Sequence, residues 1–214
     1  MHRALLARKY RLALTPEQKK QFELKVLAEK LFKEKKKSYP QSVGPRFIDD
    51  RLNEEQKPLK QAFQVNQLNG EKIMYSTSVT KYDRHGYKPR ERALLLTNKH
   101  LFVLDGKTFK IKHSLGFDIV QEIVVTTESD NLLLVRIPPE YKKDKGDLIL
   151  EVNHLIEAVT MVVDVTKKPQ ILKIMEAGTI AHNLIGGKQG VIDITTGTNH
   201  SIVKGKSGHL VVSL

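Results

Sequence analysis

The chain has 214 residues and no cysteine, and 40% of its residues are hydrophobic. This length and composition are typical of a globular protein with a real core, and the lack of cysteine excludes disulfides and thiolate metal sites. The formal net charge of +12 is unusual. Because a positive field attracts polyanions, the expected partners are nucleic acid, anionic membrane surfaces or acidic proteins.

The basic charge is concentrated in two segments. Residues 1–37 carry 12 basic and 4 acidic side chains, a net of +8, and residues 81–112 carry 9 and 3, a net of +6. Arginine and lysine interrupt residues 1–14, so this segment lacks the apolar run of a signal peptide. No apolar run in the sequence is long enough to span a bilayer. We therefore expect a cytoplasmic protein for which any membrane contact is peripheral.

The first predicted element is a helix over residues 15–37. Thr15, Pro16 and Gln18 form a capping-box start, and apolar residues recur at helical spacing on one face. The other face is rich in lysine and ends in Lys33, Lys35, Lys36 and Lys37. A lysine run at this end of a helix is ordinarily solvated and favoured by the helix dipole, and the alternative is a secondary membrane contact.

Residues 38–61 are rich in proline, glycine and polar side chains and are predicted to form a wrapping linker. From Phe63 onward the pattern becomes one of short strands separated by turn residues. Strands are expected near residues 71–80, 92–96, 100–105, 107–112, 119–127, 131–137 and 147–152. Between two of them, Asp105-Gly106 predicts a tight hairpin turn.

A second helix is predicted over residues 153–169, with Asn153 as its cap and Pro169 as its stop. The tail then returns to strands over residues 189–197, 201–207 and 209–214. Many strands, one helix and further strands indicate an α+β fold, in which a mainly antiparallel barrel or sandwich packs against a helix.

The sequence offers no candidate catalytic residue, metal site or cofactor site. Its eight histidines lack zinc-site spacing, and no paired carboxylates or activated nucleophile stand out. Gly205-Lys206-Ser207 looks like the end of a phosphate-binding loop, but His200 occupies the earlier glycine position, so we reject this interpretation. Aromatic residues make up only 6% of the chain and tryptophan is absent, which argues against stacking on single-stranded nucleic acid.

A basic hairpin carries the most specific signal. Residues 81–92 are predicted to form a strand end, a loop and the start of a second strand. Residues two apart in a strand share a face, so Lys88, Arg90 and Arg92 point the same way. Lys81 could reach them from across the hairpin. Such cations can hold a multiply phosphorylated headgroup. On spacing alone, a solvated hairpin with incidental charges is an equal alternative.

The run KYDRHGYKPRERALLLTNKHLFVLD resembles the signature of the tail homology 1 domain of class I unconventional myosins. FKEKKKSYPQSVGPRFIDDRL is similar to the beginning of such tails, and ILKIMEAGTIAHNLIGGKQGVIDITTG to their end. The resemblance covers nearly the whole chain and fits the short-tailed members. It implies a pleckstrin-homology-like β-barrel that binds phosphoinositides and other anionic phospholipids, and a non-catalytic tail that anchors an actin-based motor.

By this resemblance Lys81 and Arg92 match the two basic positions of the pleckstrin-homology lipid-binding signature. The implied phosphoinositide-binding set is Lys81, Arg84, Lys88, Arg90 and Arg92. The implied organisation is an exit from the lever region over residues 1–14, a helix and linker over 15–61, and the barrel with its helix and terminal strands over 62–214.

The resemblance also implies partners and location. Anionic membrane phospholipids are the expected ligands, while actin and ATP would be bound only through a motor domain that the chain lacks. The basic, partly amphipathic residues 1–14 offer a candidate calmodulin contact, and no nucleic acid is expected. The protein would lie on the cytoplasmic face of the plasma membrane and vesicles, with the actin cytoskeleton. The alternative is a basic nucleic-acid- or protein-binding module with no lipid pocket.

Overall fold

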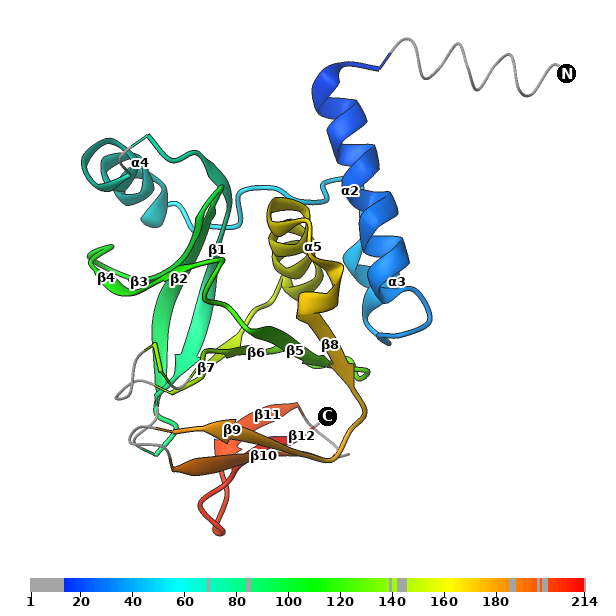
Figure 1. Ribbon diagram of the computed structural model, residues 1–214, viewed down its shortest axis with the longest axis vertical. Helices are drawn as coiled ribbons and strands as arrows, with labels where there is room; N and C mark the ends of the chain where they lie inside the picture. Colours follow the sequence, from blue (N-terminus) through cyan, green and yellow to red (C-terminus); the bar gives the residue numbers. More distant parts are fainter. Residues whose placement is uncertain are drawn as a thin grey trace, which may run out of the picture.

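Two β-sheets and a group of helices build the molecule (Figure 1). The computed structural model describes residues 14–68, 70–83, 86–138, 140–141, 146–184, 188–195, 197 and 200–213. The described helices are α2 (Pro16–Phe32), α3 (Tyr39–Ser42), α4 (Gln56–Gln67), α5 (Leu155–Thr166) and the short 3-10 helix η1 (Pro169–Ile171). The described strands are β1 (Ile73–Tyr82), β2 (Pro89–Thr97), β3 (His100–Asp105), β4 (Ile111–Gly116), β5 (Glu122–Thr126), β6 (Leu132–Arg136), β7 (Leu148–Glu151), β8 (Leu172–Met175), β9 (Thr179–Asn183), β10 (Gln189–Thr195), β11 (Ser201–Lys204) and β12 (Leu210–Ser213).

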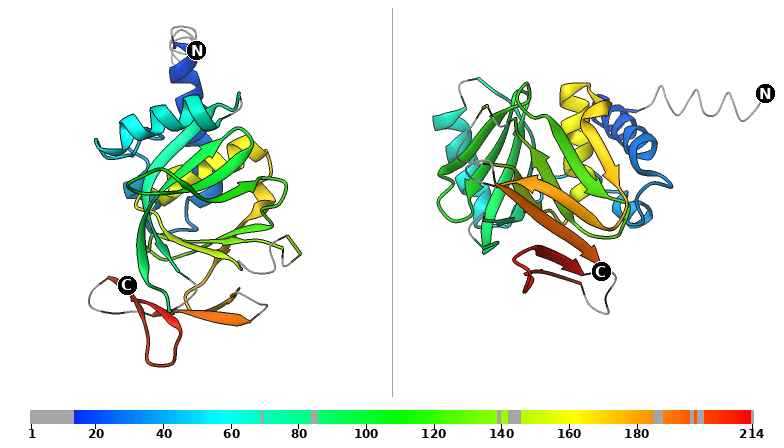
Figure 2. Two further views of the ribbon diagram at one scale, coloured as in Figure 1. Left: turned by 90° about the vertical axis from the view of Figure 1, so that its left-hand side faces the viewer. Right: turned by 60° about the horizontal axis from the view of Figure 1, so that its bottom comes forward.

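The first eight of these strands form one sheet in the order β4-β3-β2-β1-β7-β6-β5-β8, and the last four form a second in the order β11-β12-β10-β9. Neighbours are antiparallel except for β5–β8 and β10–β12. The first sheet curves around α5, and within the described strands its edges β4 and β8 do not pair (Figures 1 and 2). The α+β class is confirmed, and β1 to β7 followed by α5 match the predicted pleckstrin-homology type, although no strand pairing among the described residues closes the barrel.

Apolar side chains gather in three clusters. The main cluster fills the concave face of the first sheet beneath α5 and α2, and it includes Val79 and Val159. A second lies between the two sheets, around Ile192. The third lies under α4, where Phe63 packs edge-on against Phe102 with ring centroids 5.6 Å apart. Burial of these side chains is the dominant force that holds the sheets and helices together.

The predicted capping box of α2 is confirmed. Thr15 Oγ1 accepts from the Gln18 N–H at 3.2 Å, and Gln18 Oε1 accepts from the Thr15 N–H at 2.9 Å. The helix ends at Phe32 rather than at residue 37. Its lysine-rich end is a turn instead, because Glu34 adopts a left-handed conformation with φ of 64°.

The prediction of a linker over residues 38–61 is wrong at its C-terminal end, because α4 begins at Gln56. Pro58 is in the first turn of α4, where its missing N–H costs no helical hydrogen bond. Asn53 Oδ1 accepts from the Gln56 N–H at 2.9 Å and satisfies one of the free donors of that turn. The helix is therefore stabilised by its start and by its packing on β2 and β3, which the composition of the segment did not reveal.

The β3–β4 turn is longer than Asp105-Gly106 predicts. The Asp105 N–H donates to the Lys110 carbonyl at 2.9 Å, and the Phe109 N–H donates to the Asp105 carbonyl at 3.0 Å. The Asp105 carboxylate also accepts from two loop N–H groups. Phe109 is buried in a left-handed conformation with φ of 54°. This connection, residues 106–110, delays the start of β4 to Ile111.

The second predicted helix is confirmed as α5 with shorter limits. Its N-cap position is His154 rather than Asn153, with no side-chain capping bond, and Lys167 ends it with φ of 56° before Pro169. The sequence pattern did not predict β8 and β9. Both are short, and β8 is held by parallel pairing with β5, a partner that is distant in sequence.

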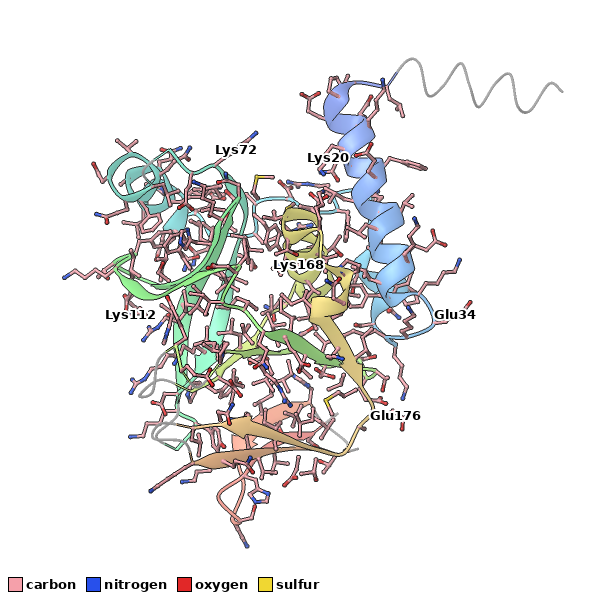
Figure 3. All side chains as sticks on the ribbon, viewed as in Figure 1. Lys20, Glu34, Lys72, Lys112, Lys168 and Glu176 are labelled. Carbon is pink, nitrogen blue, oxygen red and sulfur yellow. The ribbon has the colours of Figure 1, made fainter. Side chains whose placement is uncertain are left out.

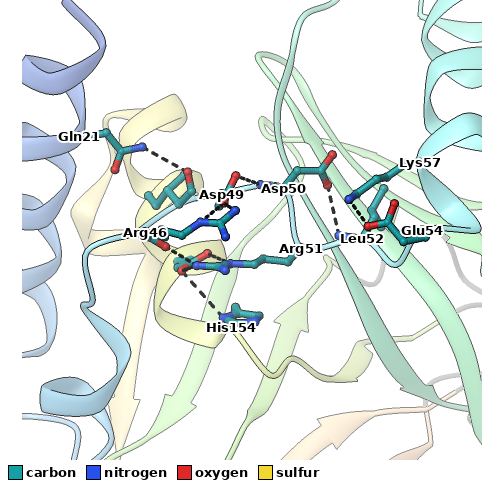
Figure 4. Close-up of polar contacts among 11 residues, drawn as sticks. Gln21, Arg46, Asp49, Asp50, Arg51, Leu52, Glu54, Lys57 and His154 are labelled. Carbon is teal, nitrogen blue, oxygen red and sulfur yellow. Dashed lines mark hydrogen bonds and ion pairs between the residues drawn. The ribbon is translucent and has the colours of Figure 1, made fainter. Parts of the chain in front are cut away.

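Arg51 clamps the segment between α3 and α4 onto α5 (Figure 4). Its Nε and Nη2 donate to the Glu157 carboxylate at 3.1 and 2.7 Å, and the Tyr75 hydroxyl donates to the same carboxylate at 3.2 Å. Glu157 is buried, so its charge needs these donors.

Among the described residues, no helix is both long and apolar enough to cross a bilayer.

Candidate anion-binding site

The β1–β2 hairpin brings three of the predicted cations to one face. In the pairing of these strands Lys81 lies opposite Arg90, and Val79 lies opposite Arg92. Because side chains alternate along a strand, these four positions share a face. Val79 belongs to the main apolar cluster, so this is the concave face of the first sheet. The cations occupy its end next to the hairpin loop, which we call the concave rim.

Two aspartates hold the guanidinium groups of the concave rim. Asp83 Oδ2 lies 3.7 Å from Arg90 Nε, and Asp105 Oδ2 lies 3.3 Å from Arg92 Nη1. Partial burial raises the pKa of Asp105, but hydrogen bonds from two loop N–H groups and the charge of Arg92 outweigh it and hold the pKa below its ordinary value. Asp105 is therefore ionised and orients Arg92.

The cations differ in exposure. Lys81 is only 9% exposed, whereas the side chains of Arg92 and Arg90 are 19% and 52% exposed. Lys88 is exposed and lies just before β2, outside the strand pairing. The structure thus brings Lys81, Arg90 and Arg92 together on one face, with Lys81 the most buried of the three and Arg90 the most exposed. Lys88 lies beside them along the chain. Arg84 lies outside the described residues.

One further cation of the concave rim was not predicted. Lys112 Nζ lies 3.7 Å from the Asp105 oxygen that also holds Arg92. The β3–β4 pairing shifts register between Val103 and Leu104, which gives β4 an extra residue at this point. No turn or strand signal in the sequence marks this irregularity, so the position of Lys112 could not be read from its spacing.

The hairpin is anchored to the second sheet beyond its loop. The Tyr87 hydroxyl oxygen lies 2.8 Å from Nε2 of His182 on β9, and both residues are buried. Gly190 on β10 makes this contact possible, because a Cβ there would lie 2.4 Å from that His182 nitrogen. Tyr87 itself has a left-handed φ of 56°. The C-terminal strands therefore hold Tyr87, which lies two residues before β2.

A hollow of about 360 Å³ beside the hairpin has the wrong chemistry for an anion. It is lined by Glu91, Glu151 and Arg92 together with Val79 and neutral polar residues. Two carboxylates against one guanidinium repel a phosphate, so the concave rim is the better candidate. Among the described residues there is also no group of three His, Asp or Glu side chains that could hold a metal ion.

The predicted secondary contact separates into surface and buried residues. The exposed members are Lys33, Lys35 and Lys37. Lys36 is 2% exposed, and its Nζ donates to the carbonyls of Thr126 and Glu128 at 3.0 and 2.8 Å and lies 3.7 Å from Asp130 Oδ2. Burial lowers the pKa of the Lys36 ammonium, and Asp130 opposes part of this effect. The prediction that Lys36 contacts a membrane is therefore wrong, and Lys36 is a buried residue that stabilises the fold.

Comparison with known proteins decides the family. A family model described as "Unconventional myosin tail, actin- and lipid-binding" matches residues 38–214. The chain belongs to this family. Similar curated proteins are unconventional myosin IC of Drosophila melanogaster, 47% identical over 99% of this chain, unconventional myosin-Ic of Gallus gallus, 39% over 93%, and unconventional myosin-Ih of Homo sapiens, 33% over 97%. The chain spans only 20%, 19% and 20% of these proteins.

This class I myosin tail is a tail homology 1 domain and a non-catalytic region of such proteins. Among solved structures it is similar to the hSac2 domain from human phosphoinositide phosphatase Sac2, with a TM-score of 0.41 and 12% identity over 60% of this chain and 88% of that one. A DH/PH domain of human ARHGEF11 gives a TM-score of 0.39 and 15% identity over 72% of this chain and 41% of that one. Scores this low carry no argument about function.

Proposed function

We propose that this tail binds phosphoinositides and other anionic phospholipids at the concave rim of the β1–β2 hairpin. It would thereby tether an actin-based motor to the cytoplasmic face of the plasma membrane and vesicles. The observation that carries the proposal is the cross-strand placement of Lys81, Arg90 and Arg92 on one face. The description of the family as actin- and lipid-binding supports the class of ligand.

The charge of the concave rim fits a phosphorylated headgroup. The cations of the concave rim, with Lys88 beside them along the chain, outnumber its two aspartates, and they are Lys81, Arg90, Arg92 and Lys112. A phosphomonoester carries about −1.5 to −2 charges, so a bisphosphate balances the excess. The planar guanidinium groups suit bidentate contacts, and each nearby cation adds about 1 kcal/mol of attraction to an anionic leaflet.

Vesicle co-sedimentation tests this proposal, with neutral phosphatidylcholine vesicles compared with vesicles that also contain phosphatidylinositol bisphosphate. Arg92→Ala and Lys81→Ala should each weaken binding to the second kind about tenfold or more, because a hydrogen bond to a charged group contributes about 1.5–3 kcal/mol. Lys72→Ala is the matched control. Lys72 is exposed and precedes β1 (Figure 3). At the rise of an extended strand, about 30 Å separates it from Lys81.

The outcomes separate a headgroup site from diffuse attraction. Equal losses for Arg92→Ala and Lys72→Ala would refute a site at the concave rim. Full competition by duplex DNA at physiological salt would favour the alternative of a nucleic-acid-binding module. Salt should weaken the contribution of exposed charges more than that of the part-buried Arg92. At about 0.1 M salt, dissolved ions screen the attraction between exposed charges that are more than about 10 Å apart, and they screen buried charges much less.

A further inference from the structure

A groove lies between α4 and the β3–β4 connection, and we call it the α4 groove. Its volume is about 390 Å³, and the apolar residues that line it are Leu59, Ala62, Phe63, Phe109 and Ile111. In β2, Leu94 belongs to the main cluster on the concave face, whereas Leu95 belongs to the cluster under α4. Figure 1 accordingly shows α4 and α5 on opposite sides of the first sheet. A partner in the α4 groove would therefore leave the concave rim free for a headgroup.

The apolar side chains of the α4 groove are recessed rather than protruding. Phe63 and Phe109 are buried and form its floor, whereas Ala62 and Ile111 are exposed at its walls, and Ile111 is 45% exposed. A bilayer surface contacts side chains that project from a protein, but a single apolar side chain can enter a groove and reach its floor. The shape therefore favours an apolar side chain of a protein partner over a lipid surface.

Hydrogen bonds hold the two walls of the α4 groove in place. Gln56 is the first residue of α4, and its side-chain Nε2 donates to the Gly106 carbonyl at 3.1 Å. The Asp105 carboxylate accepts from the N–H groups of Lys107 and Thr108, both at 3.2 Å. The β3–β4 connection is thus fixed to α4 at one end and to β3 at the other. A partner would find the groove already formed, which lowers the entropy cost of binding.

The segments that line the α4 groove carry positive charge and no negative charge. Neither α4, nor residues 106–110, nor β4 contains an aspartate or a glutamate. Lys57 and Lys60, in the first half of α4, are held in ion pairs with carboxylates that precede the helix. Lys107 and Lys110 are exposed, and in the described part of the chain neither forms an ion pair. Charge complementarity therefore selects an acidic partner.

We propose that the α4 groove docks an acidic peptide segment of a protein partner. One large apolar side chain of the segment is seated on Phe63 and Phe109, and its carboxylates lie against Lys107 and Lys110. An apolar anchor within a polar rim is the usual anatomy of a protein interface. The tail would then hold a protein on one face of its first sheet while the other face remains free for a membrane.

Selection of short random peptides, displayed on phage, against the intact tail tests this inference. The selected peptides should carry aspartate or glutamate on both sides of a phenylalanine, leucine or isoleucine. Fluorescence polarisation then measures the affinity of the most enriched peptide. Ala62→Trp fills the groove and Lys110→Glu reverses a charge at its border, so each should weaken binding about tenfold or more.

Two variants are matched controls. Ala62→Ser leaves the groove open and should bind the peptide like the wild type. Lys168→Glu makes the same charge change as Lys110→Glu, but Lys168 is exposed just beyond α5, on the other side of the first sheet (Figure 3). Its effect should stay below about twofold, because dissolved ions screen exposed charges that are far apart. Arg92→Ala should leave peptide binding unchanged.

Several results would overturn the inference. Selection that enriches no peptide, or peptides without acidic residues, would do so, and so would wild-type affinity for Ala62→Trp. If Ala62→Trp and Lys110→Glu instead weakened binding to bisphosphate vesicles as much as Arg92→Ala, the groove would belong to the membrane surface. Circular dichroism should give the same spectrum for every variant, because Ala62 and Lys110 are exposed. The inference does not depend on the lipid site, so failure of Arg92→Ala in the vesicle assay would leave it standing.

Discussion

Replacing Lys36 by methionine removes an ammonium group that lies in the core rather than on the basic surface. The change keeps a stem of similar length but leaves the carbonyls of Thr126 and Glu128 without this donor. It also leaves Asp130, whose side chain is fully buried, without its cation. Asp130 keeps its hydrogen bonds from the Leu132 N–H and the Thr126 hydroxyl.

Breaking a buried ion pair from one side costs about 3–5 kcal/mol. A domain is stable by only about 5–15 kcal/mol, so Lys36→Met should remove a large part of the total. At about 2–4 °C per kcal/mol for this size of chain, the melting temperature should fall by roughly 6–20 °C. Urea denaturation followed by circular dichroism measures the free energy directly.

Lys35→Met is the matched control, because Lys35 is exposed in the same turn. It should change the free energy of unfolding by less than about 0.5 kcal/mol. Lys36→Met combined with Asp130→Asn should recover part of the loss, since the second change removes the unpaired charge. A loss below about 1 kcal/mol for Lys36→Met would refute the reasoning. So would a weaker membrane affinity of the folded Lys36→Met protein than of Lys35→Met.

Two further predictions concern the clamp on α5. Arg51→Ala should lower the free energy of unfolding by about 3–5 kcal/mol, because it leaves the buried carboxylate of Glu157 without its cation. Arg51→Lys should recover part of this loss. An unchanged urea midpoint for Arg51→Ala would contradict the clamp. Burial lowers the pKa of His154 from its ordinary value of 6.5, although Glu157 opposes this. The folded state then binds a proton less readily than the unfolded state, so stability should fall as pH drops through about 6.5 and level off below the folded pKa. His154→Gln should lose this slope, and an opposite slope in the wild type would refute the assignment.

Local signals predicted the elements whose stability is local. The capping box at Thr15 and Gln18 and the strand pattern from β1 to β3 could be read directly, because a cap and an alternation of side chains involve only neighbours in sequence. Helix α4 was missed because the Pro58 that suggested a linker lies in the first turn, and packing of Phe63 on Phe102 completes the helix.

The candidate site shows the same division. Alternation along a strand was enough to predict that Arg90 and Arg92 share a face, and charge counting located the two basic segments. Only tertiary structure decided that Lys36 is buried against Asp130, that a register shift brings Lys112 to Asp105, and that α4 forms a groove with the β3–β4 connection. The physical reason is that spacing in a strand follows from covalent geometry, whereas burial and charge pairing depend on segments that meet only when the sheets and helices have packed.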